Sequence, residues 1–336
     1  MSPAQTKGGG KSVNMHSCPW QPAANLEVLR ARAGMLAQIR QFFAQRGVLE
    51  VETPILSQAG NTDPHLASFS VNPPSGGARR YLHTSPEFAM KRLLAAGSGP
   101  IYQVARVFRA DERGRLHNPE FSMLEWYRPG WDHHQLMDEV DALLQQLTGT
   151  PPATRVTYAD AFAAHCQIEP HAADIRALRE AAVRLDVGLV DAGTAQLARS
   201  DWLDLLMSHV VAPALGRNHP VFIYDFPESQ AALARVRRGV PAVAERFELF
   251  VAGVELANGF HELVDADEQQ RRFVADVAAR RASGQEAIPI DERLLAALRA
   301  GLPPCAGVAL GLDRLLMQIT ANDDVGEVLA FPWERA

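Results

Sequence analysis

The sequence predicts an α+β protein. Two stretches predict antiparallel strand pairs: residues 101–127, where two apolar segments enclose a polar loop around Gly114, and residues 246–255, where two apolar segments meet at Gly253. Apolar residues with helical spacing over residues 26–46 and 132–149 predict helices that flank these strands.

Composition excludes several classes of protein. The 336 residues suffice for one large catalytic domain or two smaller ones, and the formal net charge of −6 argues against broad nucleic-acid binding. The cysteines (Cys18, Cys166 and Cys305) have neither metal-ligand nor disulfide spacing, so we expect a reducing, cytoplasmic compartment. Residues 1–24 lack the apolar region of a secretory signal and predict a flexible tail, and no apolar run is long enough to span a membrane.

The first ordered element is a helix followed by a short strand. Asn25 caps the helix, which continues to about Arg46 and ends at Gly47. Residues 48–52 then predict a strand that stops at Pro54. This pattern fits a dimerisation element, and it fits equally well a helix and edge strand of a monomer core.

A second helix opens near a candidate ligand group. After a short strand at residues 81–83, Thr84 or Ser85 caps a helix with Pro86 in its first turn. Glu87 has two interpretations: a carboxylate that stabilises the helix N-terminus, or a group that faces a ligand cation.

The central hairpin is dense in charge. Arginine guanidinium groups such as that of Arg109 suit phosphate oxygens, and His117 and Phe121 offer flat faces to a base. Glu125 and Tyr127 lie two residues apart on the second strand, so they share one face and form a receptor for an ammonium group. The alternative is an ordinary charged surface hairpin.

The middle of the chain is mostly structural. Residues 155–218 predict an Ala-rich helical insertion packed on the sheet, and residues 221–225 predict a strand stopped by Pro227. Glu255 and Glu262 flank Asn258-Gly259, and two such carboxylates could bind Mg²⁺ through oxygen ligands. The alternative is a surface turn with solvated acids. Residues 267–283 and 291–301 predict two further helices.

The last informative stretch is GVALGLDRLLM, residues 307–317. An apolar strand meets Gly311, where a ligand can approach the backbone closely, and a helix follows. A cation such as Arg314 in the first turn is disfavoured by the helix dipole unless an anion occupies that end. This position therefore points to a polyphosphate.

Taken in order, the helix–strand–proline element, the arginine-rich hairpin and the strand–helix resemble motifs 1, 2 and 3 of class II aminoacyl-tRNA synthetases. The resemblance covers the chain from about residue 26 and is closest to the lysyl enzymes, through LHTSPEF, RLHNPEF, MLEWY and ELANGFHEL. It implies the class II catalytic fold, with a mixed, mainly antiparallel sheet flanked by helices, and a homodimer formed through the motif 1 helix.

The chain passes from its tail almost directly into motif 1, so we expect no anticodon-binding domain. In this it resembles the paralogues of lysyl-tRNA synthetase that activate (R)-β-lysine with ATP and Mg²⁺ and join it to a lysine side chain of elongation factor P. The resemblance therefore implies an aminoacyl-adenylate intermediate and argues against tRNA as a partner.

The same resemblance implies roles for individual residues. Arg109 and Arg314 would be the catalytic groups that hold phosphates, and Glu255 and Glu262 would bind Mg²⁺. The ATP site would comprise Arg109, Asp111, Glu112, Arg115, His117, Asn118, Phe121, Glu255, Leu256, Gly311 and Arg314. The amino acid would contact Ser85, Glu87, Glu125, Tyr127, Glu262 and Ala309, with Glu87 facing the backbone-side amino group and Glu125 and Tyr127 facing the terminal ammonium.

Two positions depart from the pattern. Asp111 stands where motif 2 usually has glutamate, with Glu112 beside it, so either could contact the adenine amino group. Ala309 stands where lysyl enzymes have glycine, and its methyl group could favour a β-amino over an α-amino substrate. Two other functions stay open: a truncated lysyl-tRNA synthetase that activates α-lysine, and a catalytically dead amino-acid-binding paralogue.

Overall fold

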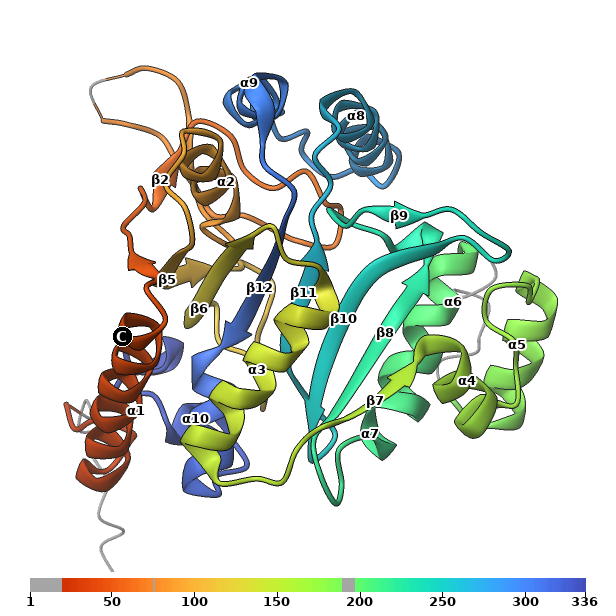
Figure 1. The fold of residues 1–336 in the computed structure, drawn as a ribbon, viewed down its shortest axis with the longest axis horizontal. Coiled ribbons are helices and arrows are strands. Elements are labelled where there is room, and N and C mark those ends of the chain that lie inside the picture. The colour runs from red at the N-terminus through yellow and green to blue at the C-terminus, as the bar shows by residue number, and fades with distance from the viewer. Residues whose placement is uncertain (1–19, 75, 189–196) are drawn as a thin grey trace, which may run out of the picture.

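The computed structural model describes residues 20–74, 76–188 and 197–336, so most of the predicted tail lies outside the described residues (Figure 1). A long mixed sheet crosses the molecule. Its strand order is β1-β5-β6-β12-β11-β10-β8-β7, and β9 pairs with β10. The bounds are β1 (Leu49–Glu50), β5 (Ile101–Phe108), β6 (Glu120–Pro129), β12 (Cys305–Gly311), β11 (Val254–His261), β10 (Val243–Val251), β9 (Val236–Arg237), β8 (Val221–Pro227) and β7 (Thr154–Thr157).

Most strand pairs in this sheet are antiparallel. The exceptions are the two edges, where β1 runs parallel to β5 and β7 runs parallel to β8. Both predicted hairpins are confirmed, since β5 pairs with β6 and β10 pairs with β11 in antiparallel register, with Gly253 at positive φ in the second turn. A small sheet of order β2-β4-β3 lies apart, formed by β2 (Leu56–Ser57), β4 (Arg80–Leu82) and β3 (Ser70–Val71).

Three helices cover one face of the sheet: α1 (Leu26–Gln45), α3 (His133–Thr148) and α10 (Leu312–Thr320). Asn25 caps α1 as predicted, and α3 begins with a capping box of Asp132 and Gln135 and ends at Gly149 in a left-handed conformation. Their apolar faces enclose the largest core, in which Phe43 stacks on Tyr102 of β5.

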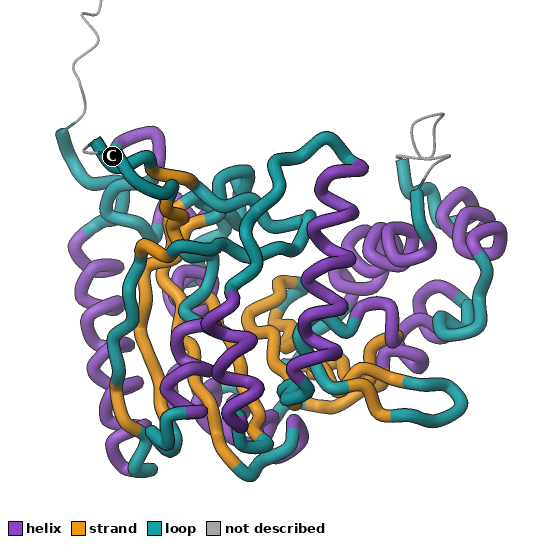
Figure 2. The backbone as a smooth tube through the Cα atoms, turned by 90° about the horizontal axis from the view of Figure 1, so that it is seen from above, coloured by secondary structure: helices purple, strands orange, loops and turns teal. Residues whose placement is uncertain are grey.

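The helices α2 (Glu87–Ala95), α8 (Ala266–Ala282) and α9 (Glu292–Gly301) form a second group beyond the end of the central strands, seen from above in Figure 2. They share a core with Tyr127 of β6 and Cys305 of β12. The start of α2 differs slightly from the prediction. Pro86 occupies the N-cap position without a side-chain cap, and the Ser85 hydroxyl instead accepts a hydrogen bond from the Glu87 N–H (3.0 Å).

The region predicted as a helical insertion begins with a strand. Residues 154–157 pair in parallel with β8 because Thr154, Val156 and Thr157 are β-branched and lie beside an open sheet edge. Beyond β7 the region is helical, with α4 (Tyr158–Cys166), α5 (Ile175–Arg184), α6 (Arg199–Leu206), a π-helical turn (Met207–Val211) and α7 (Ala212–Ala214). These helices share a separate apolar core with β8. Short 3₁₀ turns occur at Glu228–Gln230, Val325–Glu327 and Trp333–Arg335.

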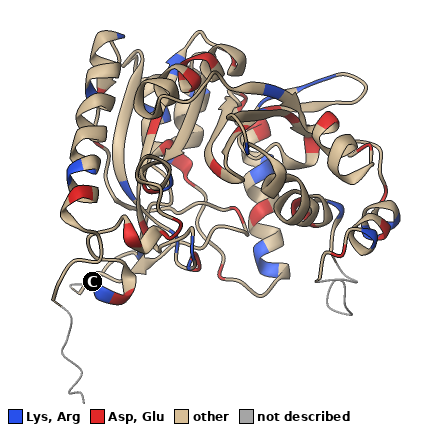
Figure 3. Cartoon of the chain, turned by 90° about the horizontal axis from the view of Figure 1, so that it is seen from below, with Lys and Arg blue, Asp and Glu red and all other residues tan. Residues whose placement is uncertain are grey.

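Charges of both signs are interspersed along the chain in Figure 3, in keeping with the modest net charge. No helix among the described residues is both long and apolar enough to cross a membrane. Cys166 and Cys305 are free and buried.

Candidate active site

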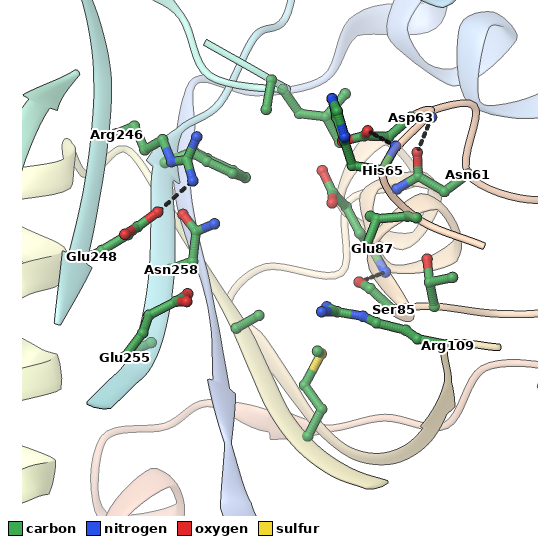
Figure 4. Close-up of a pocket in the computed structure, with 18 of the residues that line it drawn as sticks. Asn61, Asp63, His65, Ser85, Glu87, Arg109, Arg246, Glu248, Glu255 and Asn258 are labelled. Carbon is green, nitrogen blue, oxygen red and sulfur yellow. Dashed lines mark hydrogen bonds and ion pairs between the residues drawn. The ribbon is translucent and has the colours of Figure 1, made fainter. Parts of the chain in front are cut away.

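A cavity of about 780 Å³ opens on the face of the sheet opposite α3 and is lined by segments far apart in sequence. Figure 4 shows two of its walls. Arg246, Glu248, Glu255 and Asn258 project from β10 and β11, and they face Ser85, Glu87, Arg109 and the loop of residues 61–65. A cavity of this volume accommodates a nucleotide and a small second substrate.

Two arginines mark one end of the cavity. Arg109 follows β5, its guanidinium lies 5.1 Å from the centre of the Phe121 ring, and it forms an ion pair with Glu112 (3.1 Å). Its Nε is buried and has no hydrogen-bond partner among the described residues. Such an unpaired donor is costly unless a ligand supplies the acceptor. Arg109, a predicted site residue, therefore lines the cavity with a donor that suits an anionic ligand.

Arg314 enters the same region from the first turn of α10. Its guanidinium donates to the backbone oxygen of Glu255 (2.8 Å), lies 3.8 Å from the carboxylate of Glu255 and contacts Nε2 of His117 (2.6 Å). Burial, together with the Arg314 charge, lowers the pKa of His117. The neutral ring can then accept a hydrogen bond from Arg314, which fixes the direction of the guanidinium.

The sequence left open whether Asp111 or Glu112 contacts the adenine amino group, and the two side chains occupy different places in the structure. Glu112 lines the cavity, whereas Asp111 is exposed and outside its lining. Asn118 and Phe121 both line the cavity, and Asn118 also accepts a hydrogen bond from the backbone N–H of Trp333 (3.0 Å). Glu112 is therefore the better candidate for contact with a base.

Arg115 takes a different course from the one implied by the resemblance. Its side chain donates to the backbone oxygen of Asp323 (2.8 Å), and it does not line the cavity. In this structure it ties the hairpin loop to the C-terminal segment, because the Arg115 carbonyl also accepts from Val325 N–H (2.8 Å).

The other end of the cavity is closed and acidic. Glu125 is 2 % exposed, and its two oxygens accept hydrogen bonds from Ser85 Oγ (2.6 Å) and Tyr127 Oη (2.7 Å). Burial, reinforced by the Glu87 and Glu262 carboxylates, raises the pKa of Glu125 to about 8. Burial also raises the pKa of Tyr127 well above its ordinary value, so its hydroxyl remains a donor. The predicted shared face of Glu125 and Tyr127 is confirmed.

A buried lysine stands beside this group. Lys91 lies one turn after Glu87 in α2, and its ammonium is 2.6 Å from Glu87 Oε1 and 2.6 Å from Glu262 Oε2. Burial alone would lower the pKa of Lys91, but the two carboxylates outweigh burial and raise it. Burial raises the pKa of Glu262 to about 7, opposed by Lys91 and assisted by Glu87.

Glu255 and Glu262 therefore belong to different parts of the cavity. Glu255 is the second residue of β11 and lies near Arg314, whereas Glu262 follows the far end of β11, about seven strand residues or roughly 23 Å along the backbone. The carboxylate near Glu255 is that of Glu248, which forms an ion pair with Arg246. Burial, opposed by Arg246 and reinforced by Glu255, raises the pKa of Glu248 to about 7. The geometry does not support the predicted pair of Glu255 and Glu262 on one ion.

The floor of the cavity comes from β12 and β11. Gly307, Ala309 and Gly311 alternate along β12 and line the cavity, with Ala309 opposite Glu125 in the register of β6. Leu256 on the neighbouring strand also lines it. Of the predicted site residues, all except Asp111 and Arg115 lie at this one cavity.

Comparison with known proteins identifies the architecture. Residues 20–335 match the family described as tRNA synthetases class II (D, K and N). The chain belongs to this family. It is also 52% identical over 321 residues to proteins named elongation factor P–(R)-β-lysine ligase from Hamiltonella defensa subsp. Acyrthosiphon pisum (strain 5AT) and from Salmonella enteritidis PT4 (strain P125109). Each alignment covers 94% of this chain and 98% of the relative.

The class II synthetase assignment confirms the family resemblance and the fold class that the sequence predicted. Sequence reasoning missed several residues that line the cavity of this class II protein, among them Arg246, Glu248, Asn258 and Gly307, and it missed the buried Lys91 beside Glu87 and Glu262. The spacing of Lys91 four residues after Glu87 was a usable signal for an ion pair. The alternation of Arg246 and Glu248 along one strand face was another.

A second polar cluster lies behind the cavity, on the other face of β10 and β11. Ligand atoms of His133, Glu245 and His261 all lie within 4.8 Å of one another. However, Arg235 already contacts both oxygens of Glu245 (2.6 and 3.0 Å), and Arg237 lies 3.7 Å away. With two guanidinium groups at the Glu245 carboxylate, this cluster is an ion-pair network rather than a metal centre.

Proposed function

We propose that this protein is a ligase that activates (R)-β-lysine with ATP and transfers it to a lysine side chain of elongation factor P. The observation that carries the proposal is one cavity with arginines at its open end and paired carboxylates at its closed end. Relatives with the named ligase activity align over nearly their whole length.

The reaction follows from this polarity. Ammonium groups of the amino acid bind at Glu87, Glu125 and Glu262, so its carboxylate points toward Arg109 and Arg314. A carboxylate oxygen then attacks the α-phosphorus of ATP, and pyrophosphate leaves. Both arginines stabilise charge that develops on the phosphate oxygens. The amine of the acceptor lysine attacks the adenylate carbonyl, an amide forms, and AMP leaves with the electron pair of the broken bond.

Mg²⁺ fits the open end of this cavity. The half-exposed Glu255 carboxylate lies near both Arg314 and the buried Glu248, and such hard oxygen donors suit this ion. We propose Glu255 with Glu248 as the acidic ligands, in place of the predicted Glu255 with Glu262. When bound, Mg²⁺ would neutralise phosphate charge.

We further propose a cytoplasmic homodimer formed through α1 and the short strands beside it. Leu26, Leu49, Ile55 and Leu56 are exposed apolar side chains in this part of the chain. A second copy of the same surface would bury them by a two-fold interface. The free, buried state of Cys166 and Cys305 agrees with a reducing compartment. Sedimentation of the purified protein tests the dimer, and a concentration-independent monomer would contradict it.

The decisive experiment is ATP–pyrophosphate exchange with (R)-β-lysine and L-α-lysine in parallel, followed by mass spectrometry of elongation factor P. We expect faster exchange with (R)-β-lysine and one β-lysyl addition on the factor. Preferential exchange with L-α-lysine and charging of tRNA would instead support the truncated synthetase. Absence of exchange with either amino acid would support the catalytically dead paralogue.

A further inference from the structure

A cation that belongs to the protein lies directly behind the closed end of the cavity. The Lys91 side chain is 2% exposed, and its ammonium lies 2.6 Å from a carboxylate oxygen of both Glu87 and Glu262. Glu87 comes from the same helix, whereas Glu262 comes from the far end of β11. Lys91 therefore links α2 to the residue that follows β11.

A count of charges shows what the pocket lacks. Three carboxylates face it: Glu87 from α2, Glu125 from β6 and Glu262 after β11. Among the described residues, the other ionisable groups packed against them are the Tyr127 hydroxyl and the Cys305 thiol, both neutral. With Lys91 as the built-in cation, two of the three carboxyl groups have no cation among the described residues, in keeping with the raised pKa of Glu125 and of Glu262. Buried carboxyl groups ionise readily only when a cation is present as a partner, and here the ligand would have to supply it.

We propose that Lys91 is a positioning and specificity-determining residue: it holds Glu87 and Glu262 in place and sets at two the number of positive charges that a substrate must bring. The pocket thereby selects amino acids with two ammonium groups over amino acids with one. This inference rests on the proposed function only in taking this cavity as the amino-acid site.

The lysine acts at a distance from the reacting atoms. Substrate carboxylate and phosphate meet near Arg109 and Arg314, whereas Lys91 lies behind Glu87 and Glu262. Its loss should therefore weaken amino-acid binding and leave nucleotide binding unchanged. A loss of general stability would instead affect both substrates together.

Chemical rescue separates these roles. Lys91→Ala removes three carbons and the ammonium, which n-propylammonium reproduces. Calorimetry should show roughly 100-fold weaker binding of L-lysine or (R)-β-lysine to Lys91→Ala, the size expected when one partner of a buried ion pair is lost. ATP affinity should change less than about twofold, and n-propylammonium should restore binding in a saturable manner. Tetramethylammonium at equal ionic strength should not.

Arg92→Ala is the matched control, since Arg92 is the next residue of α2 and is exposed. It should behave like wild type with and without n-propylammonium. Lys91→Met keeps the volume without the charge and serves if the alanine variant does not fold. Unchanged amino-acid affinity in a folded Lys91 variant, or equal loss for amino acid and ATP without rescue, would overturn the proposal.

A wild-type measurement covers the case in which no Lys91 variant folds. The number of protons exchanged with buffer on binding is compared for lysine and for its analogue with a hydroxyl in place of the terminal ammonium. The two numbers should differ by about one, because the carboxyl group that faces the missing ammonium must be protonated when the analogue binds. Equal proton exchange would overturn the charge count. Absence of product on elongation factor P would refute the proposed function but not this inference.

Discussion

Affinity for the amino acid should depend steeply on pH because Glu125 must be ionised to receive an ammonium group. Burial raises the pKa of Glu125 to about 8, with further contributions from Glu87 and Glu262 and opposing hydrogen bonds from Ser85 and Tyr127. A carboxyl group with a raised pKa is neutral below that pKa, so the competent fraction grows as pH rises. From pH 6 to pH 8 it grows from about 1% to about half, an increase of roughly 50-fold.

The assay is the KM for (R)-β-lysine in ATP–pyrophosphate exchange at pH 6, 7 and 8, with the KM for ATP measured alongside. The side-chain ammonium of the substrate stays charged over this range, so the enzyme alone accounts for the change. We expect the amino-acid KM to fall by roughly 50-fold from pH 6 to pH 8. Glu125→Gln should bind weakly at every pH and lose most of this dependence. An amino-acid KM that is the same at pH 6 and pH 8 would refute the reasoning.

Three substitutions probe other parts of the cavity. In Gly307→Ala the new methyl group would overlap the Tyr127 ring and lie 2.5 Å from Glu262 Oε1. We expect the amino-acid KM to rise by roughly 10- to 100-fold with the ATP KM unchanged, because overpacking costs about 1–3 kcal/mol; an amino-acid KM equal to that of wild type would contradict this. In Ala309→Gly the ratio of kcat/KM for (R)-β-lysine over L-α-lysine should fall by roughly tenfold, the usual effect of one methyl-sized change in a pocket, and an unchanged ratio would exclude a role for the methyl group. In Arg314→Met, kcat should fall by about 100- to 1000-fold while calorimetry detects unchanged amino-acid affinity, and near-normal kcat would remove Arg314 from the mechanism.

The sequence predicted the parts of the fold that have strong local signals. The strand β6 was predictable because its own run of apolar residues is a local signal. The helix α10 was predictable because Gly311, the polar residues after it and the apolar spacing all lie within one short window. The parallel pairing of β7 with β8 was not, since the partners are more than 60 residues apart and β7 has only four residues. The sequence therefore predicted a helical region from about residue 155, where the structure has the strand β7.

The site was predictable where residue type alone limits the chemistry. The cavity is lined, as predicted, by Arg109, Arg314, Glu125 and Tyr127. Their charges and spacing pointed to ligand binding without any knowledge of the fold. Arg115 shows the limit of this reasoning, because its guanidinium donates a hydrogen bond to the backbone oxygen of Asp323, a residue far away in the sequence. Glu255 and Glu262 likewise lie at different ends of the cavity because β11 runs along it. The spacing of the two residues in the sequence does not reveal the direction of that strand.

The difference in depth between the two ends of the cavity has a kinetic consequence. Glu125 and Glu262 are 2% and 1% exposed, whereas the Arg109 and Arg314 side chains are 25% and 22% exposed. A nucleotide that occupies the outer position would block the route to the inner one, so we expect compulsory-order binding with the amino acid first. A non-reactive ATP analogue should then slow the association of lysine in stopped-flow measurements, and an unchanged association rate would show random order. The same arrangement would retain the adenylate until the acceptor arrives, because its aminoacyl part lies behind its own nucleotide.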